Sequence, residues 1–188
     1  GEMDARIRDE RIPLSHNYIG QETNGAGGMF KGLRTIPVIL DIVKDIQELC
    51  PKAWLINFTN PSGMITEAIY RKTNYRKAVG LCNIPINFRY EIAKYLNVDV
   101  NRIYLEFVGL NHMDFITKVY FDGEDITKEA VEAFSKASST VKNIDDVPWD
   151  PNFLKGLGMI PNDYLRYYFK REDMLKKLLE AFKNNGTR

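Results

Sequence analysis

The stretch AWLINFTNPSGMITEAIYRKTNYRKAVGLCNIPINF, residues 53–88, contains two short apolar runs separated by one helix length of mixed sequence. The runs cover 53–58 and 77–81, and turn-forming residues stand on both sides of each. Runs of this kind are typical of buried parallel strands. The segment between them predicts a helix over 64–72. The stretch therefore indicates a strand–helix–strand unit of a parallel sheet.

Helical patterns continue the alternation on either side of this unit. Apolar residues recur at helical spacing over 36–49, and Pro51 ends that pattern. A second helix is predicted over 85–97, with Pro85 in its first turn. The alternation of helices and strands predicts an α/β fold with a doubly wound parallel sheet.

Polar residues follow both predicted strands at the point where ligand sites occur in such sheets. Asn60 lies just after the first strand, and Cys82 and Asn83 follow the second. The carboxyl ends of parallel strands meet at one edge of an open α/β sheet, and ligands bind at that edge. We therefore expect these three residues near a binding site.

The sequence changes character after residue 97. Apolar residues alternate within 103–121, and Asp122-Gly123 is a turn signal, so partly antiparallel strands of a second domain are predicted. Asn111 and His112 follow the first of these strands. Further along, the pattern predicts a helix, a loop and another helix, over 128–138, 139–151 and 163–182.

Composition and charge are those of an ordinary globular protein. Of the 188 residues, 44% are hydrophobic and 27% are charged, and the net charge is +1. This balance gives no electrostatic reason to expect nucleic acid or an anionic membrane as a partner. No apolar stretch approaches the roughly 20 residues of a membrane span. Two cysteines in dissimilar settings do not form a disulfide framework, so a cytoplasmic location is predicted.

Cys82 and His112 are candidate metal ligands. Two ligands alone would form an open site, whose coordination shell is completed by substrate oxygens or water, as Lewis-acid catalysis requires. The alternative is a cysteine that packs as a small apolar side chain and a histidine with structural hydrogen bonds. Spacing alone does not decide between the two interpretations.

Charged and aromatic residues give three further candidates, each with a structural alternative. The glycine-rich segment that contains Glu22 can hold an anion at the start of a helix or form a flexible turn. The arginine cluster that begins at Arg6 can bind a phosphate or form a solvated surface. Tyr164 can act as a general base if a nearby cation lowers its pKa from about 10, or it can pack with Tyr168 on one helix face.

Five segments together resemble glycoside hydrolase family 4, and within it the NAD- and manganese-dependent 6-phospho-β-glucosidases. They occur in the order and approximate spacing of that family over essentially the whole chain. These segments are ARIRDERIPL with IGQETNGAGG, NFTNPSG, GLCNIPINF, GLNHMDF and DYLRYYF.

The resemblance implies that the chain is an internal part of a longer enzyme. The family begins with a strand and a glycine-rich loop for the NAD pyrophosphate, and this sequence has no such segment. Residues 1–84 are then the second half of a Rossmann-like NAD-binding domain. Residues 85–188 begin an α+β substrate- and metal-binding domain, in an arrangement like that of lactate and malate dehydrogenases. We expect a homo-oligomer at full length, and the chain alone can be inactive.

The resemblance also implies roles for single residues. Cys82 and His112 match the ligands of Mn²⁺ or another divalent transition metal. Tyr164 matches the catalytic base, and Glu22 matches the acid that makes this tyrosine more basic. Four residues match positions that bind the phosphorylated glucoside or disaccharide, and the second of them also contacts NAD: Arg6, Asn60, Asn83 and Asn111.

The implied reaction differs from the usual mechanism with two carboxylates. NAD oxidises the sugar 3-hydroxyl group, a base removes the C2 proton, and the metal stabilises the enediolate. Elimination, addition of water and return of the hydride follow. The α-selective branch carries aspartate at the position of Asn83, so a β-linked substrate is expected. The alternatives are a 6-phospho-α-glucosidase or α-galactosidase of the same family, a 2-hydroxy-acid dehydrogenase, and a folding or assembly module without activity.

Overall fold

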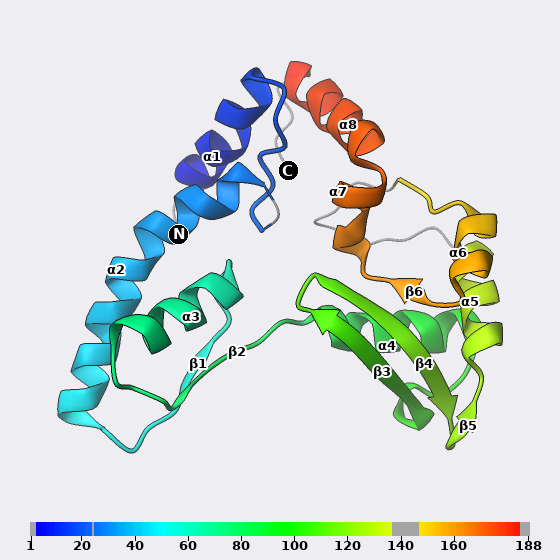
Figure 1. Ribbon diagram of the computed structural model, residues 1–188, viewed down its shortest axis with the longest axis horizontal. Helices are drawn as coiled ribbons and strands as arrows, with labels where there is room; N and C mark the ends of the chain where they lie inside the picture. Colours follow the sequence, from blue (N-terminus) through cyan, green and yellow to red (C-terminus); the bar gives the residue numbers. More distant parts are fainter. Residues whose placement is uncertain (1–2, 24, 137–146, 185–188) are drawn as a thin grey trace. The chain divides into compact units, whose positions relative to one another are not determined.

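The computed structural model describes residues 3–23, 25–136 and 147–184 (Figure 1). The chain divides into two compact units. The first unit comprises residues 1–82 and 175–188, and the second comprises residues 83–174. The functional domain boundary expected after residue 84 stays a prediction.

The first unit is built on a parallel strand–helix–strand element, as the sequence predicts. β1 (Leu55–Asn57) and β2 (Ala78–Gly80) pair in parallel, and α3 (Ser62–Lys72) connects them. The apolar residues on one face of this element form the core of the unit with the inner face of the preceding helix. The buried core residues are Val43, Ile65, Ile69, Tyr75 and Ala78.

Two helices precede the sheet. α2 (Ala26–Leu49) packs against α3, and α1 (Met3–Ser15) packs against α2 (Figure 1). α2 begins inside the glycine-rich segment, where the loop approaches the helix closely. A Cβ atom at Gly28 would lie 2.5 Å from the carbonyl oxygen of Glu22. Glycine at this position therefore lets the loop with Glu22 lie directly against α2.

The other face of the two strands is apolar and exposed. Ile56 and Val79 are register partners, and they are 61% and 38% exposed. Large apolar side chains adjoin them along both strands: Trp54, Phe58 and Leu81. We call these five residues the apolar sheet face. Since uncovered faces of this kind mark interaction surfaces, the first unit has apolar surface for which the described residues provide no cover.

The second unit contains an antiparallel sheet. β3 (Ile103–Leu110) and β4 (Met113–Phe121) form a hairpin that confirms the predicted antiparallel strands. Asn111 and His112 form the two-residue turn between them. Two short strands extend the sheet on β4: β5 (Glu124–Asp125) and β6 (Ile160–Pro161).

Helices cover one face of this sheet. α4 (Ile84–Leu96) and α5 (Thr127–Lys136) pack against each other, and the rings of Phe88 and Phe134 lie 6.3 Å apart between them. The short elements η1 (Val100–Arg102) and α6 (Pro151–Leu157) were not expected from the sequence. Of the predicted loop over 139–151, residues 139–146 lie outside the described residues.

The last predicted helix, over 163–182, is wrong as a single element. The structure has η2 (Asp163–Leu165), α7 (Arg166–Phe169) and α8 (Arg171–Lys183). The backbone of Lys170 leaves the helical region at φ −127° and ψ 36°, and its ammonium group donates to the carbonyl of Pro148 at 2.8 Å. The helix therefore ends at Lys170, where this residue contacts Pro148, which is distant in the sequence. In the described ranges, no helix combines the length and apolar character needed to cross a membrane.

Candidate active site

A cleft in the first unit brings together three residues that the sequence analysis assigned to one site. Its volume is about 760 Å³. Arg6 enters it from α1, Glu22 from the loop before α2, and Asn60 from the loop after β1. Segments that are far apart in the sequence therefore form one surface, which local sequence patterns did not predict.

Glu22 lies between two cations in this cleft. Its carboxylate forms ion pairs with Lys31 of α2 and, at 3.8 Å, with Nη2 of Arg6. The Glu22 side chain is only 17% exposed. Arg6 also donates from Nε to Glu10 at 3.2 Å, one helical turn further along α1. These contacts fix the carboxylate in the wall of the cleft.

The cleft has a surplus of positive charge. Among its described lining residues, basic side chains outnumber the single carboxylate, that of Glu22. The basic residues are Arg6, Arg8, Lys31 and Arg34. Arg34 is already paired with Asp9 of α1, to which its Nη1 donates at 2.9 Å. The remaining surplus suits an anionic group such as a phosphate.

A buried asparagine shapes the loop that carries Asn60. Asn57, the last residue of β1, is 4% exposed, and its side-chain oxygen accepts a hydrogen bond from the Thr59 backbone N–H at 3.0 Å. Its amide nitrogen donates to the carbonyl of Thr59 at 3.3 Å. The Asn60–Pro61 peptide that follows is cis. The turn fixed in this way brings Asn60 to the cleft.

Cys82 and Asn83 follow the carboxyl end of β2, as predicted. Cys82 is half-buried and forms no disulfide. Asn83 is exposed at the N-cap position of α4, and its side chain makes no capping hydrogen bond to that helix. Its amide group is therefore not used to satisfy the helix end and can face a ligand.

His112 lies in the turn between β3 and β4 with a backbone conformation that is rare outside glycine. Its φ is 66°, in the left-handed region, while its side chain is only 2% exposed. Burial lowers the pKa of His112 to about 4, so the imidazole is neutral at pH 7. A neutral imidazole has a lone pair for a metal ion. Asn111, the other turn residue, is exposed.

Tyr164 packs directly on His112. The two rings are parallel within 10°, with their centroids 3.9 Å apart. Tyr164 is 6% exposed and belongs to η2, whereas Tyr168 is 50% exposed in the next helix. The ring of Tyr164 also lies 6.3 Å from that of Tyr167, so burial and ring contacts favour packing with His112 and Tyr167 over the alternative in which Tyr164 packs with Tyr168.

The predicted site residues are divided between the two units. The first unit contains the three residues of the cleft and Cys82. The second unit contains the other four: Asn83, Asn111, His112 and Tyr164. Lys31 and Asn162 contact these residues and were missed. The nine-residue separation of Lys31 from Glu22 follows no local pattern. Asn162 had a signal, since an Asn before a helical turn is a common capping residue.

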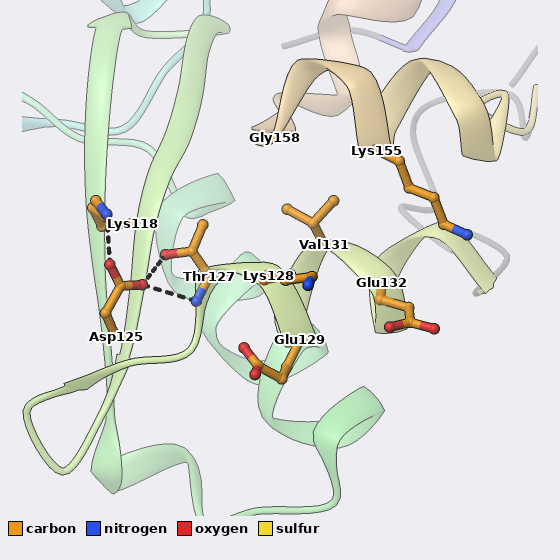
Figure 2. Close-up of a pocket in the computed structure, with 9 residues that line it drawn as sticks. All are labelled: Lys118, Asp125, Thr127, Lys128, Glu129, Val131, Glu132, Lys155 and Gly158. Carbon is orange, nitrogen blue, oxygen red and sulfur yellow. Dashed lines mark hydrogen bonds and ion pairs between the residues drawn. The ribbon is translucent and has the colours of Figure 1, made fainter.

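A second cavity, of about 770 Å³, lies in the second unit and contains none of the predicted residues (Figure 2). Figure 2 shows Asp125 hydrogen-bonded to Lys118 and to Thr127, so part of its charge is already neutralised. Lys155 and Glu132 project from neighbouring helices. The lining is polar and open, and we assign no chemistry to it.

Taken singly, the side chains of Cys82 and His112 are of donor types that divalent transition metals bind. A thiolate and a neutral imidazole suit Mn²⁺, Fe²⁺ or Co²⁺ better than Mg²⁺, which prefers oxygen ligands. The burial of His112 and its neutral state meet the requirement for the nitrogen ligand. For NAD, the fitting feature is the carboxyl edge of β1 and β2, which carries Asn60 and Cys82.

Comparisons with known proteins all indicate one protein family. Residues 1–98 match the family described as family 4 glycosyl hydrolase, and residues 107–188 match the C-terminal domain of that family. The probable 6-phospho-beta-glucosidase of Bacillus subtilis is 56% identical over 100% of this chain and 43% of its own length. The 6-phospho-beta-glucosidase of Escherichia coli is 49% identical, with the same coverage.

A solved structure of the 6-phospho-beta glucosidase from Thermotoga maritima, with manganese, NAD+ and glucose-6-phosphate, has a TM-score of 0.82 to this chain. The identity is 39%, over 95% of this chain and 42% of that one. Relatives named for 6-phospho-alpha-glucosides or maltose-6'-phosphate share 29–31% identity. The chain therefore spans less than half the length of the relatives that it matches.

These similarities confirm two predictions from the sequence. The likeness to the Thermotoga maritima structure confirms the α/β fold class, with its Rossmann-like parallel part and the antiparallel part that follows. The family matches cover most of the described residues. The chain belongs to the family 4 glycosyl hydrolases.

Proposed function

We propose that this chain is the part of an NAD- and manganese-dependent 6-phospho-β-glucosidase that contains the metal ligands and the catalytic base. The stack of His112 on Tyr164, with 3.9 Å between the ring centroids, is the observation that carries the proposal. It joins a neutral imidazole, which can bind a metal, to a tyrosine whose phenolate can accept a proton. The two residues come from separate motifs, so no local packing rule explains their contact.

Tyr164 of the second unit accepts the proton, and the proposed metal ligands come one from each unit. His112 and Cys82 would hold the metal, which when bound supplies a Lewis acid for the sugar oxygens. Tyr164, as the phenolate, accepts the proton from C2 of a sugar whose C3 is a ketone. Its burial excludes bulk water from the phenol oxygen. NAD, when bound, supplies the reversible oxidation at C3.

The residues of the first unit bind and orient the substrate. Arg6 has the planar donor geometry that grips a phosphate, and the surplus positive charge of the cleft favours the same group. Asn60 lines the same cleft and can contact both sugar and cofactor. Glu22, which pairs with Lys31 and Arg6, is the acid that we assign to making the catalytic tyrosine more basic.

The choice of a β-linked substrate rests on Asn83 and on the relatives. An amide cannot protonate a leaving group, whereas the aspartate of the α-selective branch can. Relatives with β-glucosidase names reach 56% identity, and those with α-glucosidase names reach 31%. Family membership also favours a glycosidase over a 2-hydroxy-acid dehydrogenase. The cytoplasmic location and the homo-oligomer remain predictions from the sequence.

The test uses a completed enzyme, in which this chain is joined to the flanking segments of the Bacillus subtilis relative. With NAD and Mn²⁺, it should cleave p-nitrophenyl 6-phospho-β-glucoside faster than the α anomer. A chelator should abolish this activity, and added Mn²⁺ should restore it. Equal or faster cleavage of the α anomer would contradict the assignment, and so would full activity in the chelator. The chain without its flanks serves as the control for activity of the part alone.

A further inference from the structure

Asn162 connects the two segments that carry the stacked rings of His112 and Tyr164. Its side-chain Nδ2 donates to Oδ1 of Asp114 at 2.7 Å, and its Oδ1 accepts from the backbone N–H of Tyr164 at 3.0 Å. Its backbone N–H donates to the carbonyl of Asp114 at 3.0 Å. Both side chains are buried, with Asn162 2% and Asp114 8% exposed. The contact therefore links β4 to η2 within the second unit.

The position of this link determines the position of the rings. Asp114 comes two residues after His112, and Tyr164 comes two residues after Asn162. The backbone bond from Asn162 to Asp114 continues the pairing of β4 with β6 by one step, beyond Phe115 opposite Pro161. Each ring thus lies two residues from one end of the same buried hydrogen bond. A change in that bond changes the spacing of the rings.

The turn that carries His112 needs such support. A non-glycine residue at φ 66° is in a disfavoured backbone conformation, which persists only where its surroundings hold it there. The bond from Asn162 to Asp114 holds the β4 end of the turn. The amide orientation is also fixed, because only the oxygen can accept from the Tyr164 N–H and only the nitrogen can donate to a carboxylate.

We infer that Asn162 is a positioning residue, which holds Tyr164 face to face with His112 through its bond to Asp114. The inference deepens the proposed function and rests on it for its catalytic consequence. The geometric part stands on the contacts alone. The side chain of Asn162 bonds to the Asp114 carboxylate and to the Tyr164 backbone, and not to either ring. Its replacement should therefore affect the proton transfer that uses Tyr164. The phosphate contact proposed for Arg6 should stay intact.

Substitutions that exchange donor and acceptor make the test specific. In Asn162→Asp, two carboxyl groups face each other and the amide donor to Asp114 is lost. In the double variant Asn162→Asp with Asp114→Asn, the amide of residue 114 donates to the carboxylate of residue 162, whose second oxygen still accepts from Tyr164. The wild type and the double variant differ only in which side of the bond carries the hydrogen, whereas the single variant has no amide donor on either side. Recovery in the double variant therefore reports the hydrogen bond itself and not a requirement for asparagine at position 162.

The first measurement reads the stack in the 188-residue chain itself, by ¹H–¹³C NMR of the histidine rings. The chain has two histidines, so His16 is an internal reference. Stacking on Tyr164 should shift the His112 ring protons upfield in the wild type. Asn162→Asp should remove this shift, and the double variant should restore it. A His112 shift that Asn162→Asp leaves unchanged, or that the double variant fails to restore, would overturn the inference.

The second measurement uses the completed enzyme with NAD and Mn²⁺. Asn162→Asp should lower kcat by about 10–100-fold, as expected when a reacting group is misplaced by about 1 Å, while KM stays unchanged. The double variant should recover kcat. Wild-type enzyme without activity on 6-phospho-β-glucosides would refute the proposed function, and the ring shifts would still decide the positioning. Active wild type with an unchanged kcat in Asn162→Asp would refute the positioning alone.

Discussion

Asp163 and Arg166 form an ion pair whose side chains are 1% and 2% exposed. The guanidinium of Arg166 also donates from Nε to the carbonyl of Val147 at 2.9 Å, and it lies 5.2 Å from the ring centroid of Trp149. Tyr164 lies between the two partners in the sequence. The pair therefore anchors both sides of the segment that carries the proposed base.

Replacing Arg166 with Met should lower the free energy of unfolding of the second unit by about 3–5 kcal/mol, because Asp163 would keep a buried charge without its partner. Unfolding in urea is followed by the fluorescence of Trp149. Trp54, which is exposed, is replaced by Phe in all variants so that it does not contribute.

The matched control for Arg166 is Lys136, whose ion pair with Glu132 on α5 is 70% and 53% exposed. Lys136→Met should change the free energy of unfolding by less than about 1 kcal/mol. A loss for Arg166→Met that is no larger than this would show that the buried pair does not anchor the segment.

Glu91 should make the stability of the second unit fall as pH rises. Burial of the Glu91 carboxyl on α4, and then the nearby charge of Asp163, raise its pKa from 4.5 to about 7, against the opposing effects of Arg166 and Lys94. Between these two values the folded state binds a proton that the unfolded state has lost. The contribution of Glu91 to stability is therefore largest below pH 4.5 and is lost as pH rises through about 7. His112, whose pKa is lowered from 6.5 to about 4, contributes in the opposite direction, so the effect of Glu91 is read from the difference between wild type and variant.

Glu91→Gln should remove this pH dependence and raise the free energy of unfolding above neutral pH by about 1–2 kcal/mol, a value reduced from the full shift because the carboxyl is only partly buried. Urea unfolding at a series of pH values measures it. Glu129→Gln, at an exposed position of α5, is the control and should leave the profile unchanged. A difference between the wild-type and Glu91→Gln profiles that stays constant across this window would contradict the burial effect.

Arg6 should contribute affinity for the phosphate group specifically. In the completed enzyme, Arg6→Ala should raise KM for a 6-phospho-β-glucoside by about 10–100-fold, the effect of one lost hydrogen bond between charged groups. Arg71→Ala, on the exposed surface of α3, is the control. Inhibition by glucose-6-phosphate should weaken in parallel. An unchanged KM in Arg6→Ala would remove Arg6 from the phosphate site.

The apolar sheet face should make the chain self-associate when it lacks its flanking segments. Contiguous exposed apolar residues on a two-stranded sheet favour association. The double variant Ile56→Lys with Val79→Lys places two charges at facing positions of this surface. It should be monomeric in light scattering at concentrations where the wild-type chain associates. A monomeric wild-type chain would also count against the alternative of an assembly module.

Much of the fold could be predicted from the sequence because it depends on local patterns. The apolar runs around Ile56 and Val79 identified the parallel pair, and the turn residues Asp122-Gly123 identified the end of the hairpin, where both residues have positive φ. The α1 helix was missed because charged residues interrupt its apolar pattern and it contains Pro13. Its contacts with α2, such as Asp9 to Arg34, become visible only in the structure.

The site could be predicted only as separate motifs. Sequence identified Glu22, His112 and Tyr164, each next to an element boundary. It did not identify which residues meet, because the stack of His112 on Tyr164 depends on the pairing of β4 with β6. The break at Lys170 was also missed, because the sequence around it favours a continuous helix. The contact of Lys170 with Pro148, 22 residues away, becomes visible only in the structure.

The most direct test of the central claim follows deuterium entry at C2 of the sugar. The completed enzyme is incubated with NAD, Mn²⁺ and a 6-phospho-β-glucoside in D₂O. Wild type should incorporate deuterium at C2 of the product, and Tyr164→Phe should lose exchange and turnover by roughly 10²–10⁴-fold, the usual contribution of a positioned base. Tyr168→Phe, at the exposed tyrosine, should behave as wild type. Exchange at the wild-type rate in Tyr164→Phe would contradict the account.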